Sequence, residues 1–214
     1  MIKINYKKLF PPLRNSLLIN YLKIDNDSVH YITTPNVANT ITSIIANVAD
    51  RYGCDSETAT IADCTAGVGG DTISFARAFG SVIAVEYNKW RCEYLKSNIN
   101  IYGFKNVTPY CTDSTKLVHG LYGVDIFYVD PPWGGSGYKD KTSLRLSIGS
   151  TPVEKLVIDL FDSEKTVSCP KLVCLKLPTN YDMKYLYTTI KARHNVDIIL
   201  YTLKKMLLVV VAKN

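Results

Sequence analysis

The sequence predicts an α/β protein with a Rossmann-like, doubly wound fold, in which helices cover both faces of a mainly parallel seven-stranded sheet. From residue 60 onward, short apolar runs rich in β-branched residues alternate with longer segments of helical period. This alternation is the pattern of parallel strands joined by crossover helices. The last two strands are separated only by residues 203–205, which cannot hold a crossover helix, so we expect a C-terminal antiparallel hairpin.

The individual elements follow from the apolar periodicity. We expect strands at residues 60–63, 81–86, 107–111, 124–129, 171–177, 196–202 and 206–211. We expect helices near residues 72–78, 89–102, 153–161 and 182–191. Five parallel strands followed by an antiparallel hairpin are typical of the S-adenosylmethionine-dependent methyltransferase fold.

The chain divides into a short N-terminal extension and one domain. A helix is expected over residues 35–52, with Thr34 as its N-cap and Pro35 at its first position. Residues 1–34 are basic and aromatic, and we interpret them as a small helical extension that packs over the site as a substrate-side lid. With 214 residues and 47% hydrophobic content, the chain can bury one substantial core, so we expect a single catalytic domain over residues 35–214.

The net charge suits a polyanionic partner such as RNA. The formal charge is +6 and the pI is about 8.9, and Lys and Arg side chains neutralise phosphates. A basic surface also serves solubility, so charge alone leaves both interpretations open. No stretch reaches the ~20 apolar residues of a membrane span, and residues 1–12 lack the apolar core of a signal peptide. We therefore expect a soluble, intracellular protein in the nucleus or the cytoplasm, monomeric by default.

The cysteines give no sign of a metal centre. They form no Cys-x-x-Cys pair and do not cluster with the three histidines, so the sequence predicts neither a metal site nor a disulfide framework. We expect reduced, mostly buried thiols. The six residues are Cys54, Cys64, Cys92, Cys111, Cys169 and Cys174.

A glycine loop after the first strand predicts a nucleotide-like ligand. The strand runs directly into Asp63-Cys64-Thr65-Ala66-Gly67-Val68-Gly69-Gly70 and then a helix, at the edge of an open α/β sheet that binds ligands. Glycines there let backbone N–H groups approach a ligand, so Asp63, Ala66, Gly67 and Gly69 are candidate cofactor-binding residues. The Gly-x-Gly-Gly spacing differs from the Gly-x-Gly-x-x-Gly of dinucleotide enzymes, which disfavours a nicotinamide or flavin cofactor.

Two further acidic residues follow the next two strands. Glu86 comes 23 residues after Asp63, where an acidic side chain accepts both ribose hydroxyls of an adenosine. Taken alone, Glu86 is a solvated strand-end acid; together with Asp63 and the glycine loop it predicts adenosine binding. Asp113, just past the third strand, is then placed to accept the adenine amino group.

The motif Asp130-Pro131-Pro132-Trp133 predicts the chemistry. Two prolines stiffen the backbone directly after a buried strand, which suits an in-line methyl transfer that depends on positioning. An exocyclic base amine is a weak nucleophile, and Asp130 with the carbonyl of Pro131 would orient its lone pair. We assign Asp130 to both the catalytic and the cofactor-binding residues.

The two tryptophans receive different interpretations. Trp133 offers a flat surface on which a base can stack, worth ~1–3 kcal/mol, and a cationic base would bind more tightly. Core burial is the commoner fate of a tryptophan, but the flanking Pro-Pro and Gly-Gly pairs favour base stacking. Trp90, at the start of an amphipathic helix, is interpreted as structural.

Over residues 31–212 the chain resembles the RNA cap guanine-N2 methyltransferases, the trimethylguanosine synthases. The resemblance rests on the glycine loop with Asp71-Thr72-Ile73, on Val82-Ile83-Ala84-Val85-Glu86, on Pro131-Pro132-Trp133-Gly134-Gly135, and on Leu177-Pro178-Thr179-Asn180. A weaker match surrounds Leu9-Phe10 in the extension.

The resemblance implies methyl transfer from S-adenosylmethionine to the 2-amino group of a 7-methylguanosine cap, toward the 2,7-dimethyl and 2,2,7-trimethyl forms. S-adenosylhomocysteine is then the other product and capped RNA the partner. Trp133 would stack on the cationic 7-methylguanine. Pro132, Phe10, Thr179 and Asn180 would join it in substrate binding, and Thr34 would line the cofactor pocket, a role compatible with its N-cap position.

Two positions depart from the family pattern. Asp130 stands where the family has Ser, which keeps a hydrogen-bond acceptor but loosens the assignment of the base. Thr179 replaces an Arg expected to meet the cap phosphates. Lys176, or the extension residues Lys3, Lys7 and Lys8, are candidates to supply that charge, although each lysine alone is more often solvated surface.

Two alternative functions remain open. In the same class, the protein would methylate an amino group of an internal adenine or guanine in RNA or DNA. In a different class, it would be a non-catalytic cap-binding subunit. The joint presence of Asp63, Glu86, Asp130 and Trp133 speaks against the second alternative.

Overall fold

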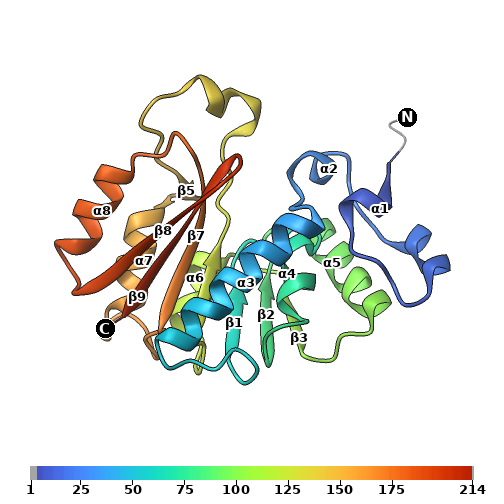
Figure 1. Ribbon diagram of the computed structural model, residues 1–214, viewed down its shortest axis with the longest axis horizontal. Coiled ribbons are helices and arrows are strands. Elements are labelled where there is room, and N and C mark those ends of the chain that lie inside the picture. Colours follow the sequence, from blue (N-terminus) through green and yellow to red (C-terminus); the bar gives the residue numbers. More distant parts are fainter. Residues whose placement is uncertain (1–3, 214) are drawn as a thin grey trace.

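A seven-stranded sheet forms the centre of the protein and confirms the predicted fold (Figure 1). The computed structural model describes residues 4–213. The strands lie in the order β3-β2-β1-β4-β7-β9-β8, with the first five parallel and the last two antiparallel, so the C-terminal hairpin inserts β9 between β7 and β8. The bounds are β1 (Thr60–Asp63), β2 (Ser81–Val85), β3 (Val107–Tyr110), β4 (Ile126–Val129), β7 (Leu172–Pro178), β8 (Val196–Leu203) and β9 (Met206–Lys213).

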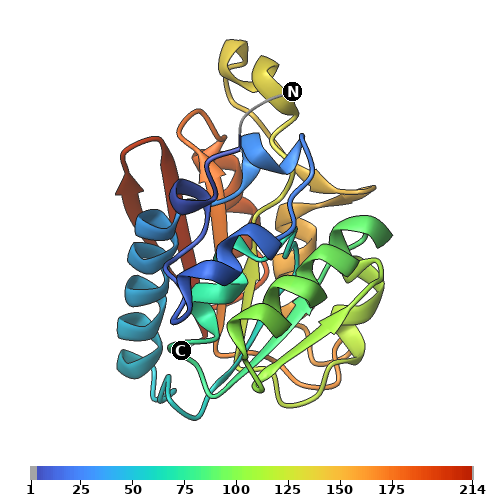
Figure 2. The same cartoon turned by 90° about the vertical axis from the view of Figure 1, so that its right-hand side faces the viewer.

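Helices cover both faces of the sheet. α3, α4 and α5 pack on one face and α6, α7 and α8 on the other (Figures 1 and 2). The bounds are α3 (Pro35–Arg51), α4 (Gly70–Phe75), α5 (Lys89–Tyr102), α6 (Ser114–Leu117), α7 (Val153–Phe161) and α8 (Met183–Lys191). The predicted bounds of α5 and α7 match those observed, and the start of α3 at Pro35 is confirmed.

Strand β4 shows why the sheet lies in the middle of the molecule. Ile126 and Tyr128 belong to the core cluster under α3 and α4, whereas Phe127 and Val129 belong to the cluster under α7 and α8. All four side chains are buried, as expected for a parallel strand covered on both faces. After β3 the chain crosses to the other side of β1 to form β4, so the carboxyl ends of β1 and β4 flank the switch point where open α/β sheets bind ligands.

Some local predictions require correction. Thr34 precedes α3, but its side chain makes no capping hydrogen bond, and Pro35 alone marks the start of this helix. α4 begins two residues earlier than predicted, because Gly69 adopts a left-handed conformation (φ 105°) that starts the turn at once. The loop that follows β4 rises above the sheet and holds elements that the periodicity did not predict (yellow in Figure 1). They are the 3-10 helix η3 (Gly135–Asp140) and the small hairpin of β5 (Ser147–Ile148) and β6 (Thr151–Pro152).

The N-terminal segment lies beside α4 and α5 (Figure 2) and is less helical than predicted. It contains only α1 (Tyr6–Leu9), the 3-10 helix η1 (Ser16–Tyr21) and α2 (Ser28–Tyr31). Phe10 is 1% exposed and packs with Leu22 and Ile24 against Val68 and Ile73 of the domain. The predicted substrate contact of Phe10 is therefore wrong, because burying this ring in an apolar cluster is more favourable than leaving it exposed.

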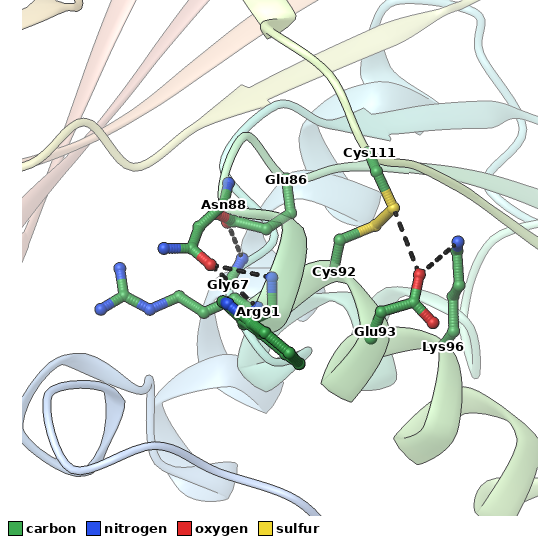
Figure 3. Close-up of a disulfide and its surroundings, with 9 residues drawn as sticks. Gly67, Glu86, Asn88, Arg91, Cys92, Glu93, Lys96 and Cys111 are labelled. Atoms are coloured by element: carbon green, nitrogen blue, oxygen red, sulfur yellow. Dashed lines mark hydrogen bonds and ion pairs between the residues drawn. A yellow bond between two sulfur atoms is a disulfide. The ribbon is translucent and has the colours of Figure 1, made fainter.

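A disulfide joins Cys92 of α5 to Cys111 after β3, which contradicts the predicted absence of disulfides (Figure 3). The cysteines are 19 residues apart in the sequence, but α5 returns against β3 and brings their Cα atoms to 5.5 Å. Spacing alone does not reveal a pair that forms only when a helix packs on a neighbouring strand. Cys54, Cys64, Cys169 and Cys174 are free thiols.

Within residues 4–213, no helix has the length and apolar character that crossing a membrane requires. In the same part of the chain, no three or more His, Cys, Asp or Glu side chains are grouped to hold a metal ion.

The disulfide predicts a measurable gain in stability. Breaking it with Cys111→Ser should lower the free energy of unfolding by about 3 kcal/mol, because the cross-link restricts the unfolded chain. Urea unfolding followed by circular dichroism measures this difference, with Cys169→Ser as the control, since that thiol is free. Titration of thiols in the denatured, unreduced protein should find four of the six cysteines reactive. Six reactive thiols would show that the bond is absent.

Candidate active site

The fold brings most of the predicted site residues to one edge of the sheet. Asp63 ends β1, and Glu86, Asp113 and Asp130 follow β2, β3 and β4. Thr179 follows β7. Because these five strands are parallel neighbours, their carboxyl ends form one continuous edge, and the switch point, where open α/β sheets bind ligands, lies between the strands that end at Asp63 and precede Asp130.

Glu86, directly after β2, holds the glycine loop through a hydrogen bond. Its Oε2 accepts the backbone N–H of Gly67 at 2.8 Å, and its Oε1 accepts the N–H of Asn88 at 2.8 Å (Figure 3). The N–H of Ala66 donates to the Val85 carbonyl at 2.9 Å. Each carboxylate oxygen still has room for another donor. Gly67 has a φ of 55° and no atom within 4 Å of the position of a Cβ, so the loop faces open space beside Glu86.

Asp63 lies buried beneath this loop. The residue is 1% exposed, its Oδ2 accepts the Thr72 hydroxyl at 2.6 Å, and its Oδ1 accepts the Thr65 N–H at 3.3 Å. Burial, reinforced by the neighbouring Asp71, raises the pKa of Asp63 to about 7. We therefore correct its predicted role: Asp63 shapes the loop and the start of α4 from below.

The loops on the two sides of the switch point are hydrogen-bonded to each other. The backbone N–H of Asp130 donates to the Thr65 hydroxyl at 2.8 Å, and the N–H of Cys64 donates to the Tyr128 carbonyl at 2.9 Å. Pro131 is buried and Pro132 is exposed. The side chain of Asp130 is 22% exposed, so it is partly accessible at this edge of the sheet.

Lys176 of β7 has a different position from the one predicted. It is 4% exposed, and its Nζ lies 2.6 Å from Asp130 Oδ2 and 2.7 Å from the Thr33 hydroxyl. A buried, paired ammonium cannot meet the phosphates of an RNA, so the predicted phosphate contact of Lys176 is wrong. Of the other lysines considered, Lys7 and Lys8 are exposed on α1, and Lys3 lies outside the described residues.

Sequence reasoning missed the rest of this buried network. Asp71 Oδ2 accepts the hydroxyls of Thr33 at 2.6 Å and Tyr128 at 3.1 Å, and it lies 3.8 Å from Lys176 Nζ. Burial raises the pKa of the Asp130 carboxyl, and the Lys176 ammonium opposes that shift. Burial lowers the pKa of Lys176, but the carboxyl groups around it outweigh this effect and raise it. No periodic pattern marks Thr33 or Asp71, because the network joins residues distant in sequence.

Trp133 lies at the base of the loop after β4. It is half-buried against the main core, and its ring stands nearly perpendicular to that of Tyr138, with the ring centres 5.1 Å apart. Its indole N–H is buried and makes no hydrogen bond within the described residues, although it is close enough to Asp130 to lower the pKa of that carboxyl. Asn180 braces the same loop by donating to the carbonyls of Tyr138 at 2.7 Å and Lys141 at 2.6 Å. Its amide nitrogen is therefore engaged by the protein and not free for a substrate.

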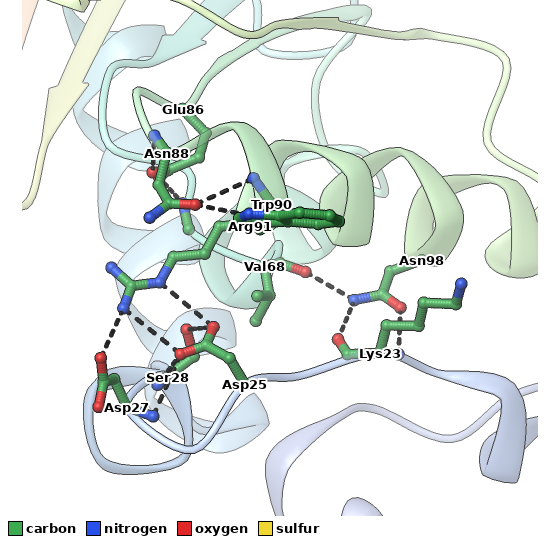
Figure 4. Close-up of polar contacts among 11 residues, drawn as sticks. Lys23, Asp25, Asp27, Ser28, Val68, Glu86, Asn88, Trp90, Arg91 and Asn98 are labelled. Atoms are coloured by element: carbon green, nitrogen blue, oxygen red, sulfur yellow. Dashed lines mark hydrogen bonds and ion pairs between the residues drawn. The ribbon is translucent and has the colours of Figure 1, made fainter.

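Polar contacts fix the N-terminal segment beside the glycine loop (Figure 4). Arg91 of α5 pairs with Asp25 and Asp27 at 3.2 Å each. Asn98, fully buried, accepts the Lys23 N–H and donates to the carbonyls of Lys23 and Val68. These contacts join the segment to the glycine loop after β1 and to α5 after β2.

Three further residues considered in the sequence have side chains that are exposed or partly exposed. Asp113 caps α6 by accepting the Thr115 N–H and hydroxyl through Oδ1, which leaves Oδ2 without such a partner. Thr34 is exposed, and its place in a cofactor pocket stays a prediction. Trp90 is 76% exposed at the start of α5, so its interpretation as a structural residue is wrong.

Residues 58–210 match the family model of the RNA cap guanine-N2 methyltransferases. The chain belongs to this family. It is 35% identical, over 96% of its length and 84% of the relative, to an uncharacterized protein of Acanthamoeba polyphaga mimivirus. It is 31% identical, over 59% of its length and 53% of the relative, to a trimethylguanosine synthase of Schizosaccharomyces pombe.

Solved methyltransferases share the fold of this family member. A precorrin-6y C5,15-methyltransferase of Geobacter metallireducens superposes with a TM-score of 0.59 and 13% identity over 91% of this chain and 95% of that one. A protein of Streptococcus mutans, solved in complex with S-adenosylhomocysteine, superposes with a TM-score of 0.55 and 14% identity over 86% of this chain and 99% of that one. At these identities the likeness shows that the chain has a methyltransferase fold.

Gly70, the last glycine of the loop, packs closely against the N-terminal segment, and a substitution there tests this contact. A Cβ at Gly70 would lie 2.8 Å from Ile32 Cγ1 and 3.1 Å from the Thr33 backbone. Gly70→Ala should therefore destabilise the protein by about 1–3 kcal/mol, as overpacking does, and limited proteolysis should cut the N-terminal segment faster. Gly120→Ala is the matched control, because nothing lies within 4 Å of its Cβ position. Equal urea midpoints for the two variants would contradict this packing.

Proposed function

We propose that this protein transfers a methyl group from S-adenosylmethionine to the exocyclic 2-amino group of a 7-methylguanosine RNA cap. The products are 2,7-dimethylguanosine and, after a second round, the 2,2,7-trimethyl form. The observation that carries the proposal is the position of Asp130 and Trp133 directly after β4, across the switch point from the glycine loop that Glu86 holds. Membership of the cap guanine-N2 family supports the same substrate.

The glycine loop and its neighbours fit an adenosine cofactor. Glu86 keeps free acceptor positions for two ribose hydroxyls, and Gly67 opens onto the space beside it. Asp113 Oδ2 would accept the adenine amino group, while Ala66 and Gly69 give the loop its shape. The S-adenosylhomocysteine complex of the Streptococcus mutans protein supports this cofactor for a shared fold. S-adenosylmethionine supplies an electrophilic methyl group on a sulfonium, and the electron pair of the broken C–S bond stays on the sulfur.

Asp130 prepares the nucleophile. The lone pair of a base amine is delocalised into the ring, and an acceptor for its N–H localises that pair and stabilises the charge that develops on nitrogen. Oδ2 of Asp130 is bonded to Lys176, so Oδ1 is the oxygen left to accept. The nitrogen forms its bond to the methyl carbon and releases one proton to water. Pro131 and Pro132 fix the backbone, which keeps this alignment at little entropic cost.

Trp133 selects the base. A 7-methylguanine carries a positive charge, and an indole face attracts a cation more strongly than a neutral ring. The perpendicular contact with Tyr138 and the bracing of the loop by Asn180 hold Trp133 in one orientation. Exposed Thr179 and Pro132 lie at the same edge, and Lys7 and Lys8 remain the candidates for the cap phosphates.

The compartment we propose is intracellular, nuclear or cytoplasmic, where RNA is processed.

One observation favours a second candidate function. Asp130-Pro131-Pro132-Trp133 carries a carboxylate where the cap family has Ser, and a carboxylate serves an amine of adenine as well as one of guanine. An internal adenine or guanine of RNA or DNA is therefore the rival substrate. A non-catalytic cap-binding subunit is the rival of another class.

Four RNAs separate these functions. With S-adenosylmethionine labelled in its methyl group, capped RNA bearing the 7-methyl group should be labelled about 5- to 30-fold faster than capped RNA without it or the two uncapped controls. The cation–π term of about 1–2 kcal/mol supplies that preference. Digestion to nucleosides identifies the methylated amine. Equal labelling of uncapped RNA would overturn the cap assignment, and tight cap binding without any methylation would point to the non-catalytic subunit.

Trp133 gives a second prediction. Trp133→Ala should lower kcat/KM for capped RNA by about 5- to 160-fold, because stacking contributes ~1–3 kcal/mol per base. The dissociation constant for S-adenosylhomocysteine, measured by calorimetry, should change less than threefold, since Trp133 concerns the base. Trp133→Phe is the matched variant that keeps an aromatic face and should retain more activity. Loss of cofactor binding in Trp133→Ala would show that Trp133 supports the cofactor site and does not act on the base alone.

A further inference from the structure

Lys176 of β7 carries a charge that is buried directly beside Asp130. The residue is 4% exposed in a central strand, and placing an ion there costs several kcal/mol unless its partners compensate. The partners are well placed: Asp130 Oδ2 at 2.6 Å, the Thr33 hydroxyl at 2.7 Å, and Asp71 at 3.8 Å. A lysine held so tightly beside the motif that follows β4 constrains that motif.

We propose that Lys176 is a positioning residue of the methyl-transfer site, which keeps Asp130 ionised and turns its free oxygen toward the amine of the base. The inference rests on the proposed function for the identity of that amine. The contact between Lys176 and Asp130 belongs to the structure itself.

The charges around Asp130 explain why an ammonium is needed. Burial and the buried carboxyl of Asp71 in α4 raise the pKa of Asp130, and Asp130 in turn raises the pKa of the buried Asp63 of β1. Tyr128 of β4 is neutral and donates its hydroxyl to Asp71. Among the charged groups that contact Asp130 in the described part of the chain, Lys176 is the one that favours its ionised form. A protonated carboxyl loses acceptor capacity, so without Lys176 the amine would lose its partner.

The geometry of Lys176 also assigns a task to each oxygen of Asp130. Oδ2 receives the ammonium, so Oδ1 is left for the substrate. Thr33 fixes the ammonium from the other side, because its hydroxyl accepts from Lys176 and donates to Asp71 at 2.6 Å. The rotation of the carboxylate is thereby set by two elements outside the motif, β7 and the residues that precede α3.

Removing the charge tests the proposal. Lys176→Met should lower kcat for capped RNA at least tenfold at pH 7, with activity partly restored near pH 9. The pH of half-maximal kcat should rise by at least one unit, because Asp130 must then lose its proton without help. Lys171→Met is the matched control: it changes an exposed lysine just before the same strand, and its pH profile should equal that of the unaltered protein.

A second variant and a direct measurement keep the test decisive. Lys176→Gln also removes the charge but keeps a donor for Asp130, so it serves if Lys176→Met does not fold. Carbon-13 NMR of the Asp carboxyl groups, with Asp130→Asn assigning the signal, follows the ionisation of Asp130 without any RNA. A higher pKa of Asp130 in either variant supports the proposal, and an unchanged pKa with an unchanged pH profile overturns it. Because the NMR titration needs no substrate, its outcome is separate from a failure to methylate capped RNA.

Discussion

The ion pair between Lys176 and Asp130 is the interaction on which the geometry of this edge of the sheet depends. It joins the strand β7 to the loop after β4, and through Thr33 and Asp71 it extends to the residues before α3 and to the first turn of α4. Buried polar groups are stable only when their partners are present, so removing one member leaves the others unsatisfied. The positions of the loop after β4 and of the first turn of α4 therefore depend on this network.

The glycine loop is held by a second set of contacts that meets the first. Asp63 holds the loop from below through Thr65 and Thr72, and Glu86 holds it from the side through Gly67. Thr65 also receives the N–H of Asp130, which makes it the direct link between the loop after β1 and the loop after β4. A shift of either loop would break this hydrogen bond, so the two sides of the switch point are positioned together.

The fold was predictable because its signals are local and repeated. Apolar runs of strand length alternate with helical segments, and the short gap at residues 203–205 requires a hairpin, so the sheet and its ending followed from the sequence. The site residues at strand ends were also predictable in outline, since a parallel sheet brings such ends together.

The burial of Lys176 was not predicted. A central parallel strand is covered on both faces, and that rule would have placed Lys176 inside, but its charge suggested a phosphate contact instead. The contacts of Phe10 and the pairing of Cys92 with Cys111 depend on how distant elements pack, which no local pattern encodes.

The N-terminal segment is connected to the chemistry more closely than a covering lid would be. Ile32 and Thr33 lie so close to Gly70 that a Cβ at this position would force a neighbour to shift, and Thr33 contacts both Asp71 and Lys176. Arg91 and Asn98 secure the preceding residues to α5. Movement of this segment would therefore displace Thr33 and release one of the partners that hold the Lys176 ammonium. The same hydrogen bonds hold the N-terminal segment in place and orient Asp130. The extension therefore contributes to the site because Thr33 completes the buried network around Lys176.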